Sequence, residues 1–492
     1  MDYAAPEKKG ISSKKIQEYI GVLEKNRLST HDLILARGDS VVFEAYWEPF
    51  HSDFLHRMYS VSKSFVSIAV GFLEQDKKLS LDDPISKYFE EELKDQQDAN
   101  MRNQTIRHML MMCTAKLERN WFTARTSDRV RFYFENDTKQ SRPSGTVFQY
   151  DSTGSFILCA LVERISGMPF MEYLRIKLFD KIGVSKEAYC LKCPGGHSWG
   201  DSGVLCKPSD LLKVARFVMN KGRWNGEQLL NERYISEATA KQVDNNFWDE
   251  DEFDTKGYGY QIWRAGENAW LFNGMGCQFA LGIPDKDLIM VYNGDNQGKE
   301  SAKKIIIDSF FDLIVNTAED EAIEGGEEAY GRLRSYSGGL TLQAASGSRQ
   351  SDWVSRVDNV IYRMDDNPMG ITRLQLSFHG DEGCLKYTNG QGDKELRFGM
   401  CRNVYGMFPQ EGYSDGVGSV CAPGNFYRCA ASGAWVEPHK LYIKVQVIDR
   451  YFGILNMFFS FRDNLVGVYM NKSAEDFLNE YVGYAGGTST SM

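Results

Sequence analysis

Strand-like segments stand at both ends of the first 316 residues, with a mainly helical stretch between them, and this arrangement constrains the fold most strongly. Residues 31–48 contain two apolar segments around a Gly38-Asp39 turn. More apolar, strand-like segments follow at 258–264, 269–273, 278–284 and 288–294. The sequence therefore predicts one antiparallel sheet built from both ends of this region. Helices over 12–27 and 299–316 would pack on it, and a helical subdomain would occupy about 84–235.

The sequence changes character after residue 317. Residues 318–333 are acidic and contain glycine, which predicts a solvated linker between the domain 1–317 and the rest of the chain. From 334 to 485, short alternating segments are separated by Gly, Asn and Asp, at 372–379, 396–398, 440–449, 454–462 and 465–471. This pattern predicts an all-β accessory domain, a barrel or closed sheet, with a flexible tail over 486–492. The expected fold class is α+β with an appended all-β domain.

Composition excludes several classes of partner. The 492 residues are too many for one ordinary core, and 42% hydrophobic with 25% charged residues describes a globular protein. The net charge of −10 without a basic stripe argues against nucleic acid and anionic membranes as partners. No uncharged apolar run approaches the roughly 18 residues that a membrane span needs, and MDYAAPEKKG lacks an apolar leader. We therefore expect a cytoplasmic protein.

The ten cysteines indicate reduced, mostly buried thiols, because a large core without an export signal does not require disulfides. Cys190, Cys193 and Cys206 form the one group to consider as a zinc site. A second C-x-x-C pair is missing and the seven histidines are scattered. The sequence therefore predicts no metal and no other cofactor.

Residues 195–203, GGHSWGDSG, contain two familiar serine-enzyme patterns, G-x-S-x-G at Ser198 and G-D-S-G at Ser202. A nucleophile elbow needs a helix that begins at once and a later histidine. Here the next helix is expected only after Pro208, and the later histidines lie in the all-β domain. The G-D-S-G pattern requires two β-barrels with an upstream histidine and aspartate. Both patterns are better explained by a glycine turn, with Trp199 as a pocket-lining residue.

A different candidate is Ser60-Val-Ser-Lys63. The string S-x-x-K also occurs at Ser12/Lys15 and Ser301/Lys304, so the string alone is weak. Only Ser60 stands at the expected start of a strongly apolar helix, which carries Phe65, Ile68, Ala69, Phe72 and Leu73 at helical spacing. Placement therefore separates Ser60 from the other two serines.

The chemistry of such a placement is specific. A serine hydroxyl needs a neighbouring base, and residues three apart share a helix face, so the Lys63 amine can reach the Ser60 oxygen. Burial and the positive end of the helix dipole disfavour the ammonium form, which lets the amine accept a proton. Free N–H groups of the first turn favour an oxyanion. The alternative is that Ser60 is an N-cap and Lys63 a surface residue.

Three further stretches give these residues a context. Tyr150-Asp-Ser152 precedes an apolar helix, and Leu271-FNGMGCQFALG holds a glycine turn between strands. Ile106-RHMLMMC lies between the Ser60 and Tyr150 motifs. In this order and spacing the chain resembles the serine β-lactamase and penicillin-binding-protein superfamily over roughly residues 10–316. Its class C-like branch includes family VIII esterases, D-aminopeptidases and 6-aminohexanoate-dimer hydrolases. The resemblance implies a β-lactamase/transpeptidase-like fold, in which the stretch from Gly195 is a scaffold turn followed by a helix.

The resemblance also implies roles for individual residues. Ser60 would be the acylated nucleophile, Lys63 its proton acceptor, and Tyr150 the general base or acid that serves the leaving group and then water. The backbone N–H groups of Ser60 and Met275 would form the oxyanion hole. Substrate contacts would come from the remaining positions, which are Ser152, Trp199, Asn273 and Gly274. The alternative for Tyr150 is an ordinary core tyrosine.

Two departures from the β-lactamase pattern bear on the substrate. Phe272 stands where penicillin-cleaving relatives usually have a lysine or a similar donor, and Ser152 stands where they have asparagine. Both argue against true β-lactamase activity. The sequence thus predicts a serine hydrolase, an esterase or amidase, that cleaves a small acyl compound through a covalent acyl-Ser60 intermediate.

Several alternatives remain open at this point. The same acyl-enzyme can serve an acyltransferase, because the choice of acceptor depends on water access. The fold can also be that of a catalytically silent binding protein. The all-β domain leaves room for a homo-oligomer, with Trp435 and Tyr451 either as exposed anchors or as barrel core.

Overall fold

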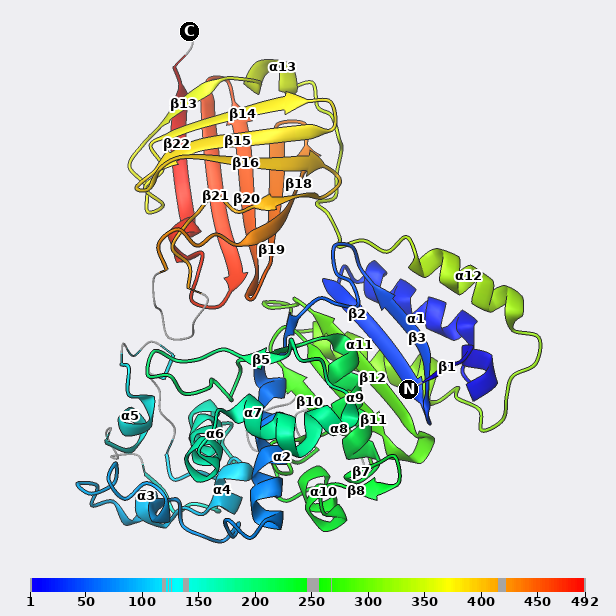
Figure 1. Cartoon of the computed structure of the whole chain (residues 1–492). Coiled ribbons are helices and arrows are strands. Elements are labelled where there is room, and N and C mark those ends of the chain that lie inside the picture. The colour runs from blue at the N-terminus through cyan, green and yellow to red at the C-terminus, as the bar shows by residue number, and fades with distance from the viewer. Residues whose placement is uncertain are drawn as a thin grey trace. The chain divides into compact units, whose positions relative to one another are not determined.

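The computed structural model describes residues 2–116, 121–122, 124, 126–135, 141–245, 256–266, 268–414 and 422–490. Contacts along the chain divide it into two compact units (Figure 1). Unit 1 spans Met1–Thr341, and unit 2 begins at Leu342. Each unit has its own sheet and its own buried interior.

Unit 1 is built on a seven-stranded sheet in the order β1-β3-β2-β12-β11-β10-β9. All of these pairings are antiparallel except β1 with β3. Strands from the two ends of the unit meet where β2 pairs with β12 over Thr30–Arg37 and Leu288–Gly294. The other strands are β1 (Asp2–Tyr3), β3 (Ser40–Tyr46), β9 (Trp263–Arg264), β10 (Trp270–Gly274) and β11 (Gln278–Ile283).

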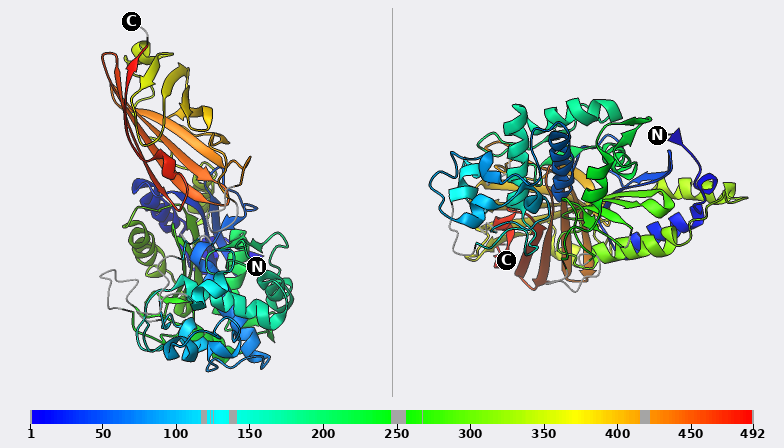
Figure 2. Two further views of the ribbon diagram at one scale, coloured as in Figure 1. Left: turned by 90° about the vertical axis from the view of Figure 1, so that its left-hand side faces the viewer. Right: turned by 90° about the horizontal axis from the view of Figure 1, so that it is seen from below.

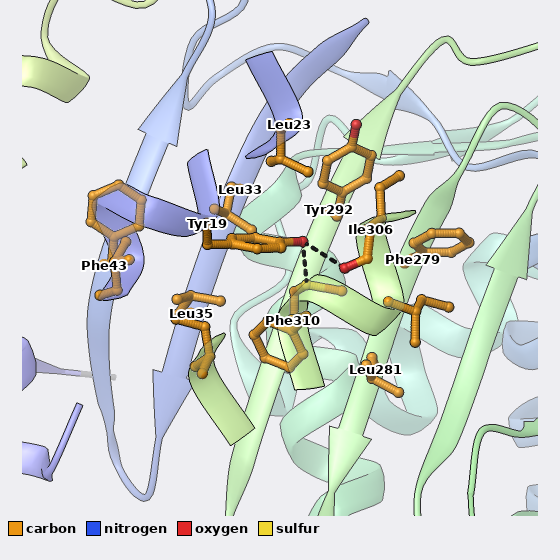
Figure 3. Close-up of a cluster of buried hydrophobic side chains, with 14 of the residues drawn as sticks. Tyr19, Leu23, Leu33, Leu35, Phe43, Phe279, Leu281, Tyr292, Ile306 and Phe310 are labelled. Carbon is orange, nitrogen blue, oxygen red and sulfur yellow. Dashed lines mark hydrogen bonds between the residues drawn. The ribbon is translucent and has the colours of Figure 1, made fainter. Parts of the chain in front are cut away.

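One face of this sheet is covered by α1 (Ser13–Lys25), α11 (Ala302–Phe310), its π-helical continuation η6 (Phe311–Val315), and α12 (Glu327–Ser337). The further views in Figure 2 show these helices together on one side of the sheet. Their apolar residues form one core with alternate residues of the strands (Figure 3). Within it, the Tyr19 hydroxyl donates to the Ile306 carbonyl at 3.2 Å. Burial raises the pKa of Tyr19, so this hydroxyl keeps its proton.

The opposite face is covered by α9 (Pro208–Met219), which packs on β2, β11 and β12. Because both faces are covered, residues 33–36 of β2 are all buried, and they read as a continuous apolar run. Next to α9 lies the helical subdomain, in which α2 (Ser62–Gln75) packs against α6 (Ser152–Ser166). The helix α2 also contacts α7 (Phe170–Leu174) and α10 (Glu232–Thr239).

The smaller elements of unit 1 complete the helical region and its edges. Its short helices are η1 (Pro6–Lys9), η2 (Tyr59–Val61), η3 (Ile85–Lys87), α3 (Ala99–Asn103), α4 (Ile106–Leu110), α5 (Arg129–Glu135), α7 (Phe170–Leu174), η4 (Arg175–Phe179), α8 (Asp180–Ile182), α10 (Glu232–Thr239) and η5 (Pro284–Lys286). Two small sheets join β4 (His56–Arg57), β6 (Val204–Cys206) and β5 (Tyr189–Cys190), and β7 (Arg223–Trp224) with β8 (Glu227–Gln228).

Unit 2 is a closed barrel of nine strands, in the order β16-β15-β14-β13-β22-β21-β20-β19-β18. It closes where Gly399 and Met400 of β16 pair in parallel with Ser432 and Gly433 of β18. Its strands are β13 (Ile361–Met364), β14 (Arg373–His379), β15 (Glu382–Asn389), β16 (Gly392–Met400), β18 (Arg428–Glu437), β19 (Lys440–Ile448), β20 (Phe452–Arg462), β21 (Leu465–Ala474) and β22 (Gly483–Ser489). Outside the ring, β17 (Val404–Met407) pairs with β18, and short helices α13 (Val354–Val357) and η7 (Asn479–Tyr481) flank the strands.

The α+β fold with an appended all-β barrel is confirmed, but three details of the predicted organisation are wrong. The proposed linker 318–333 contains most of α12, which packs on α1 within unit 1, so the division falls after Thr341 rather than at 334. The described part of the tail, 486–490, includes the end of β22, which pairs with β13 and β21. In the segment 258–264 only Trp263–Arg264 form a strand.

The interior of the barrel is filled by apolar side chains, as alternation along its strands requires. Trp435 and Tyr451 are buried, so they belong to the core rather than to an exposed anchor. The nine described cysteines are free thiols, most of them buried. No group of three or more potential metal ligands occurs among the described residues.

Within the described ranges, no single helix has the length and hydrophobicity needed to cross a bilayer. The consecutive helices Ser152–Ser166 and Phe170–Ile182 meet that criterion only when they are joined, and they are bent by 69° relative to each other.

Candidate active site

Ser60 lies in η2, the single turn that leads into α2, and its side chain is half-buried. Residues 62–73 of α2 are buried without interruption, so the helix is fixed by packing along its length. Tyr59 has φ 45°, in the left-handed region that non-glycine residues rarely adopt. Such backbone strain persists only where the surroundings enforce it, and it is common at functional sites. The strained residue here directly precedes Ser60.

Lys63 lies in the first turn of α2 and is 1% exposed. Its Nζ donates to Ser60 Oγ at 2.9 Å and to the backbone carbonyl oxygen of Asp201 at 2.7 Å. The neighbouring serines of the helix serve the fold instead: Ser62 Oγ accepts from the N–H of Val204, and Ser64 Oγ donates to the carbonyl of Gln261. The hydroxyl and amine predicted from the sequence are therefore in direct contact.

The two other S-x-x-K strings have a different environment. Ser12 caps α1 by accepting from the Lys15 N–H, and the Lys15 amine pairs with Glu18 at 2.7 Å. The Lys304 amine pairs with Asp308 at 2.9 Å. Both lysines are thus held by carboxylates on partly exposed helix faces, and neither is buried against its serine.

Tyr150 joins this site from the start of α6. The Lys63 Nζ lies 5.1 Å from the centroid of the Tyr150 ring, and that ring stacks on Trp263 with centroids 5.4 Å apart. The next residue, Asp151, caps α6 by accepting from the N–H of Thr153 at 2.9 Å, and it also accepts from Thr114 Oγ1 at 2.8 Å. These bonds fix the start of the helix and therefore the position of Tyr150.

Burial raises the pKa of the Asp151 carboxyl, while its hydrogen bonds oppose that effect. Ser152 is the first residue of α6 and is half-buried. It therefore lies beside Tyr150 and Asp151 at the helix N-terminus, as the predicted motif requires.

The end of β10 lies against the Ser60 segment. A Cβ on buried Gly274 would come 2.4 Å from the Met58 carbonyl oxygen, so only glycine allows the strand to approach this closely. Asn273 is half-buried, and Met275 is 40% exposed at the turn after the strand. The structure thus brings β10, and with it the start of β11, into contact with the η2 segment that carries Ser60.

Gln278 fixes the turn between β10 and β11, and sequence reasoning did not find it. Its Nε2 donates to the carbonyls of Met275 and Gly294, both at 2.7 Å, and its Oε1 accepts from the Gly294 N–H at 3.2 Å. The side chain is completely buried. A glutamine in an otherwise apolar strand sequence was the available signal, because a buried amide must have partners.

The turn at 199–203 contacts Lys63, but the side chain of its tryptophan is completely buried. Trp199 is 0% exposed, stacks on Trp121 with centroids 5.7 Å apart, and donates from Nε1 to Ser202 Oγ at 2.8 Å. Its predicted role as a pocket-lining residue is therefore wrong for this conformation, because aromatic packing holds the ring in the core. Ser198 is also buried, and its N–H donates to Glu163 at 3.2 Å.

Asp201 is the other residue of this turn that sequence reasoning missed. Burial raises the pKa of its carboxyl, the nearby charges of Lys63 and Arg57 oppose that effect, and the resulting pKa is about 6. Arg57 is 1% exposed and donates from Nε to the Ser202 carbonyl at 3.1 Å. A buried acid beside two cations was hidden in the sequence, where G-D-S-G indicated only a turn.

The family assignment follows from a comparison with known proteins. The profile of the beta-lactamase family matches residues 23–306, more than half of the chain. The chain belongs to this family. The match covers Ser60, Lys63, Tyr150 and the β10–β11 turn, so the assembled site lies inside the family region.

Two relatives of this beta-lactamase family member carry the name of a hydrolase. The 6-aminohexanoate-dimer hydrolase of Paenarthrobacter ureafaciens is 24% identical over 263 residues, which is 50% of this chain and 67% of the relative. A solved putative 6-aminohexanoate-dimer hydrolase from Bacillus anthracis superposes with a TM-score of 0.53 at 16% identity, covering 64% of this chain and 86% of that one.

A third relative extends over both units. The octameric penicillin-binding protein homologue from Pyrococcus abyssi has a TM-score of 0.51 at 16% identity and covers 96% of this chain and 99% of its own. At these identities the structural likenesses establish the fold alone. The order of a beta-lactamase-like unit followed by an all-β unit thus has a counterpart in a solved structure.

Proposed function

We propose that this protein is a serine hydrolase that cleaves a small acyl ester or amide through a covalent acyl-Ser60 intermediate. The observation that carries the proposal is the 2.9 Å hydrogen bond from buried Lys63 Nζ to Ser60 Oγ. A hydroxyl in contact with an amine, on a helix fixed by packing, is the arrangement that makes serine nucleophilic.

The reaction would proceed in two steps. Ser60 Oγ attacks the substrate carbonyl carbon while its proton passes to Lys63, and the N–H groups of Ser60 and Met275 stabilise the oxyanion. The carbon–oxygen or carbon–nitrogen bond of the substrate then breaks, and Tyr150 delivers the proton to the leaving group. Water, deprotonated by the same groups, attacks the acyl-enzyme and releases the acid.

Two features support a substrate other than a penicillin. Phe272 is completely buried on β10, so its position offers no donor to a substrate carboxylate. Ser152 supplies a hydroxyl where an amide would hold the side chain of a β-lactam. The aromatic stack of Tyr150 and Trp263 favours an apolar group beside the general acid. We therefore expect ester or linear amide substrates, the latter in line with the name of the 6-aminohexanoate-dimer hydrolase relative.

The test is covalent labelling with a fluorophosphonate probe. We expect the full chain to be labelled once, Ser60→Ala to lose the label, and Lys63→Met to react at least about 100-fold more slowly, as loss of a general base implies. Ser198→Ala is the matched control, because it removes the serine of the competing G-x-S-x-G pattern and should leave labelling unchanged. Unchanged labelling of Ser60→Ala would rule the assignment out.

Substrate class is then resolved with p-nitrophenyl esters of increasing acyl length, 6-aminohexanoate dimer, D-amino-acid amides and nitrocefin. We expect ester or amide turnover that requires Ser60 and little hydrolysis of nitrocefin. Adding an alcohol distinguishes an acyltransferase, which would form the new ester. Labelling of Ser60 without turnover of any compound would favour a silent binding protein.

A further inference from the structure

The turn from Gly200 to Gly203 presses directly against the buried start of α2. A Cβ on Gly200 would lie 2.5 Å from Cys159 Sγ and 2.9 Å from a methyl carbon of Val66, and a Cβ on Gly203 would lie 2.6 Å from the Trp199 carbonyl oxygen. Neither position accepts a side chain, so the glycines of this turn exist to bring its backbone into the core. The residue between them that matters most for the site is Asp201.

Two carbonyl groups of the turn accept from cations that flank the nucleophile. The Asp201 carbonyl accepts from Lys63 Nζ at 2.7 Å, and the Ser202 carbonyl accepts from Arg57 Nε at 3.1 Å. Arg57 also lies over the ring of Tyr59, with its guanidinium carbon 4.4 Å from the ring centroid. The residues on either side of Ser60 are therefore tied to the same turn.

The side chain of Asp201 is compensated by charge more than by hydrogen bonds. It is 0% exposed, its Oδ1 accepts from Ser202 Oγ at 3.4 Å, and its Oδ2 has no hydrogen-bond partner among the described residues. A carboxylate with so few donors is costly to bury unless counter-charges lie near it. The charges that stabilise its ionised form are those of Lys63 first and Arg57 second.

We infer that Asp201 is a positioning residue for Lys63: its carbonyl holds the amine against Ser60 Oγ, and its carboxylate sets how readily that amine keeps a proton. The inference rests on the proposed function and extends it to Asp201, which contacts the proposed base Lys63. An anion beside the base stabilises the protonated form that the base reaches once it has taken the serine proton, as a buried aspartate does for a catalytic histidine.

Other groups near Asp201 do not compete for this role. The ionisable or charged groups that interact with it, from the elements packed around the turn, are Lys63, Arg57, Arg129, Cys159 and Cys190. Burial raises the pKa of both thiols well above its usual range, so they are neutral in the working range. Tyr150 also faces Lys63, with its ring centroid 5.1 Å from Lys63 Nζ. Of all these groups, only Lys63 donates a hydrogen bond to Ser60 in the described structure.

The experiment is the pH profile of the fluorophosphonate labelling rate, from pH 5 to 10, on the full chain. In Asp201→Asn the ammonium form of Lys63 loses its neighbouring anion. We therefore expect the acidic midpoint to fall by about one pH unit or more, as removal of a close opposite charge implies. The plateau rate should fall about tenfold or more, since the protonated base is no longer stabilised. A merely structural role would lower the rate without moving the midpoint.

Asp32→Asn is the matched control, because Asp32 is a buried carboxyl of the same unit whose hydrogen-bond donor is Asn293. Its midpoint should equal that of the wild type. Arg57→Gln gives a second, opposite test that does not depend on the folding of Asp201→Asn. Without this cation, the Asp201 carboxylate interacts with Lys63 as its main counter-charge, which stabilises the ammonium form of Lys63. The acidic midpoint of the labelling rate should therefore rise.

The outcomes separate the two proposals. Ser60-dependent labelling of the wild type with an unmoved midpoint in Asp201→Asn, or an unmoved or lowered midpoint in Arg57→Gln, overturns the role of Asp201 and leaves the hydrolase proposal intact. A wild type whose labelling does not depend on Ser60 overturns the hydrolase proposal itself.

Discussion

Burial keeps two titratable side chains of unit 1, Asp32 and His56, neutral in the folded state, and it shifts their pKa values in opposite directions. Asp32 accepts from Asn293 Nδ2 at 2.8 Å, and burial raises the pKa of its carboxyl from 3.8 to about 8. His56 lies 2.8 Å from a ring nitrogen of His31, and burial lowers its pKa from 6.5 to about 3. In both cases removal from water disfavours the charged form.

These shifts give opposite slopes in stability. Between pH 3.8 and 8 the folded chain holds a proton on Asp32 that the unfolded chain releases, so the free energy of unfolding falls as the pH rises. Between pH 6.5 and 3, His56 is protonated in the unfolded chain and neutral in the folded chain. The free energy of unfolding therefore falls as the pH falls. Each slope approaches about 1.4 kcal/mol per pH unit, so in the overlap they largely cancel.

Asp32→Asn should remove the Asp32 contribution to the pH dependence of stability and leave that of His56. The amide keeps the acceptor for Asn293 and cannot ionise, so the variant gains stability over the wild type progressively from pH 4 to pH 8. Urea unfolding at pH 5 and pH 8 measures the difference. We expect the gain to be larger at pH 8 by about 2 kcal/mol or more, allowing for relaxation of the buried site. A gain that is equal at the two pH values would mean that Asp32 is ionised in the fold.

At the scale of elements, the site depends on how closely β10 approaches the segment that carries Ser60. Gly274→Ala places a methyl group 2.4 Å from the Met58 carbonyl oxygen, a backbone atom that no side-chain rotation can move. The strand must shift away from residues 58–60, which displaces the Met275 N–H from the proposed oxyanion hole. We expect the labelling rate to fall by about 100-fold, comparable to the loss of one oxyanion donor.

Gly21→Ala is the control for this substitution, because Gly21 lies within α1 with open space around its Cα. Alanine there should leave labelling unchanged and raise helix stability slightly. If Gly274→Ala labels as fast as Gly21→Ala, β10 has no part in the chemistry.

The elements that the sequence predicted correctly are those with strong local patterns. The continuous apolar run of β2 and the helical spacing of Phe65, Ile68 and Phe72 on α2 are visible without any knowledge of partners. By contrast, α12 is polar over most of its surface and contributes one buried residue, Leu333, so its sequence resembles a linker. The glycine-rich β22 is a strand because it pairs with β13 and β21 on either side. Its pairing with β13 joins residues far apart in the chain, so the local sequence does not reveal it.

The same reasoning explains what was predicted of the site. Ser60 and Lys63 were indicated by their spacing at the start of an apolar helix, and Tyr150 was indicated by the resemblance of its motif to those of a known family. The turn at 199–203 has no such rule. Trp199 points into the core because Trp121 is there to stack on it, and Asp201 acquires its importance from Lys63 and Arg57, far away in the chain.

At the scale of the whole molecule, the family match ends within unit 1, and the barrel of unit 2 lies outside it. The outer face of the barrel carries a row of rings, one from each of β19 to β22, stacked with centroids 4.7, 6.1 and 4.5 Å apart; these are Tyr442, Phe458, Tyr469 and Tyr484. Cross-strand pairs of this kind stabilise a sheet without help from a second layer. Each unit thus has its own source of stability.

This independence makes the division of the chain testable by truncation. We expect residues 1–341 to fold alone, unfold cooperatively in urea and retain Ser60-dependent labelling. Residues 1–317 should be less stable, because they lack α12 and the segment that follows it. That region supplies Leu333 and Leu340 to the core around α1, and the Leu340 carbonyl accepts from the Glu48 N–H at 3.0 Å.

The expected difference follows from the two buried leucines, each worth about 1.5–3 kcal/mol of burial. A chain that ends at 317 should therefore lose about 3–6 kcal/mol relative to one that ends at 341, less whatever the exposed face of α1 recovers by relaxing. The matched comparison is residues 1–341 with Leu333→Ala, which keeps the helix and removes one side chain. The stability of this variant should lie between those of the chains 1–341 and 1–317, since a cavity in a packed core costs about 2–5 kcal/mol. Equal stability of the two truncated chains would place the boundary at 317 and make α12 a linker that merely rests on unit 1.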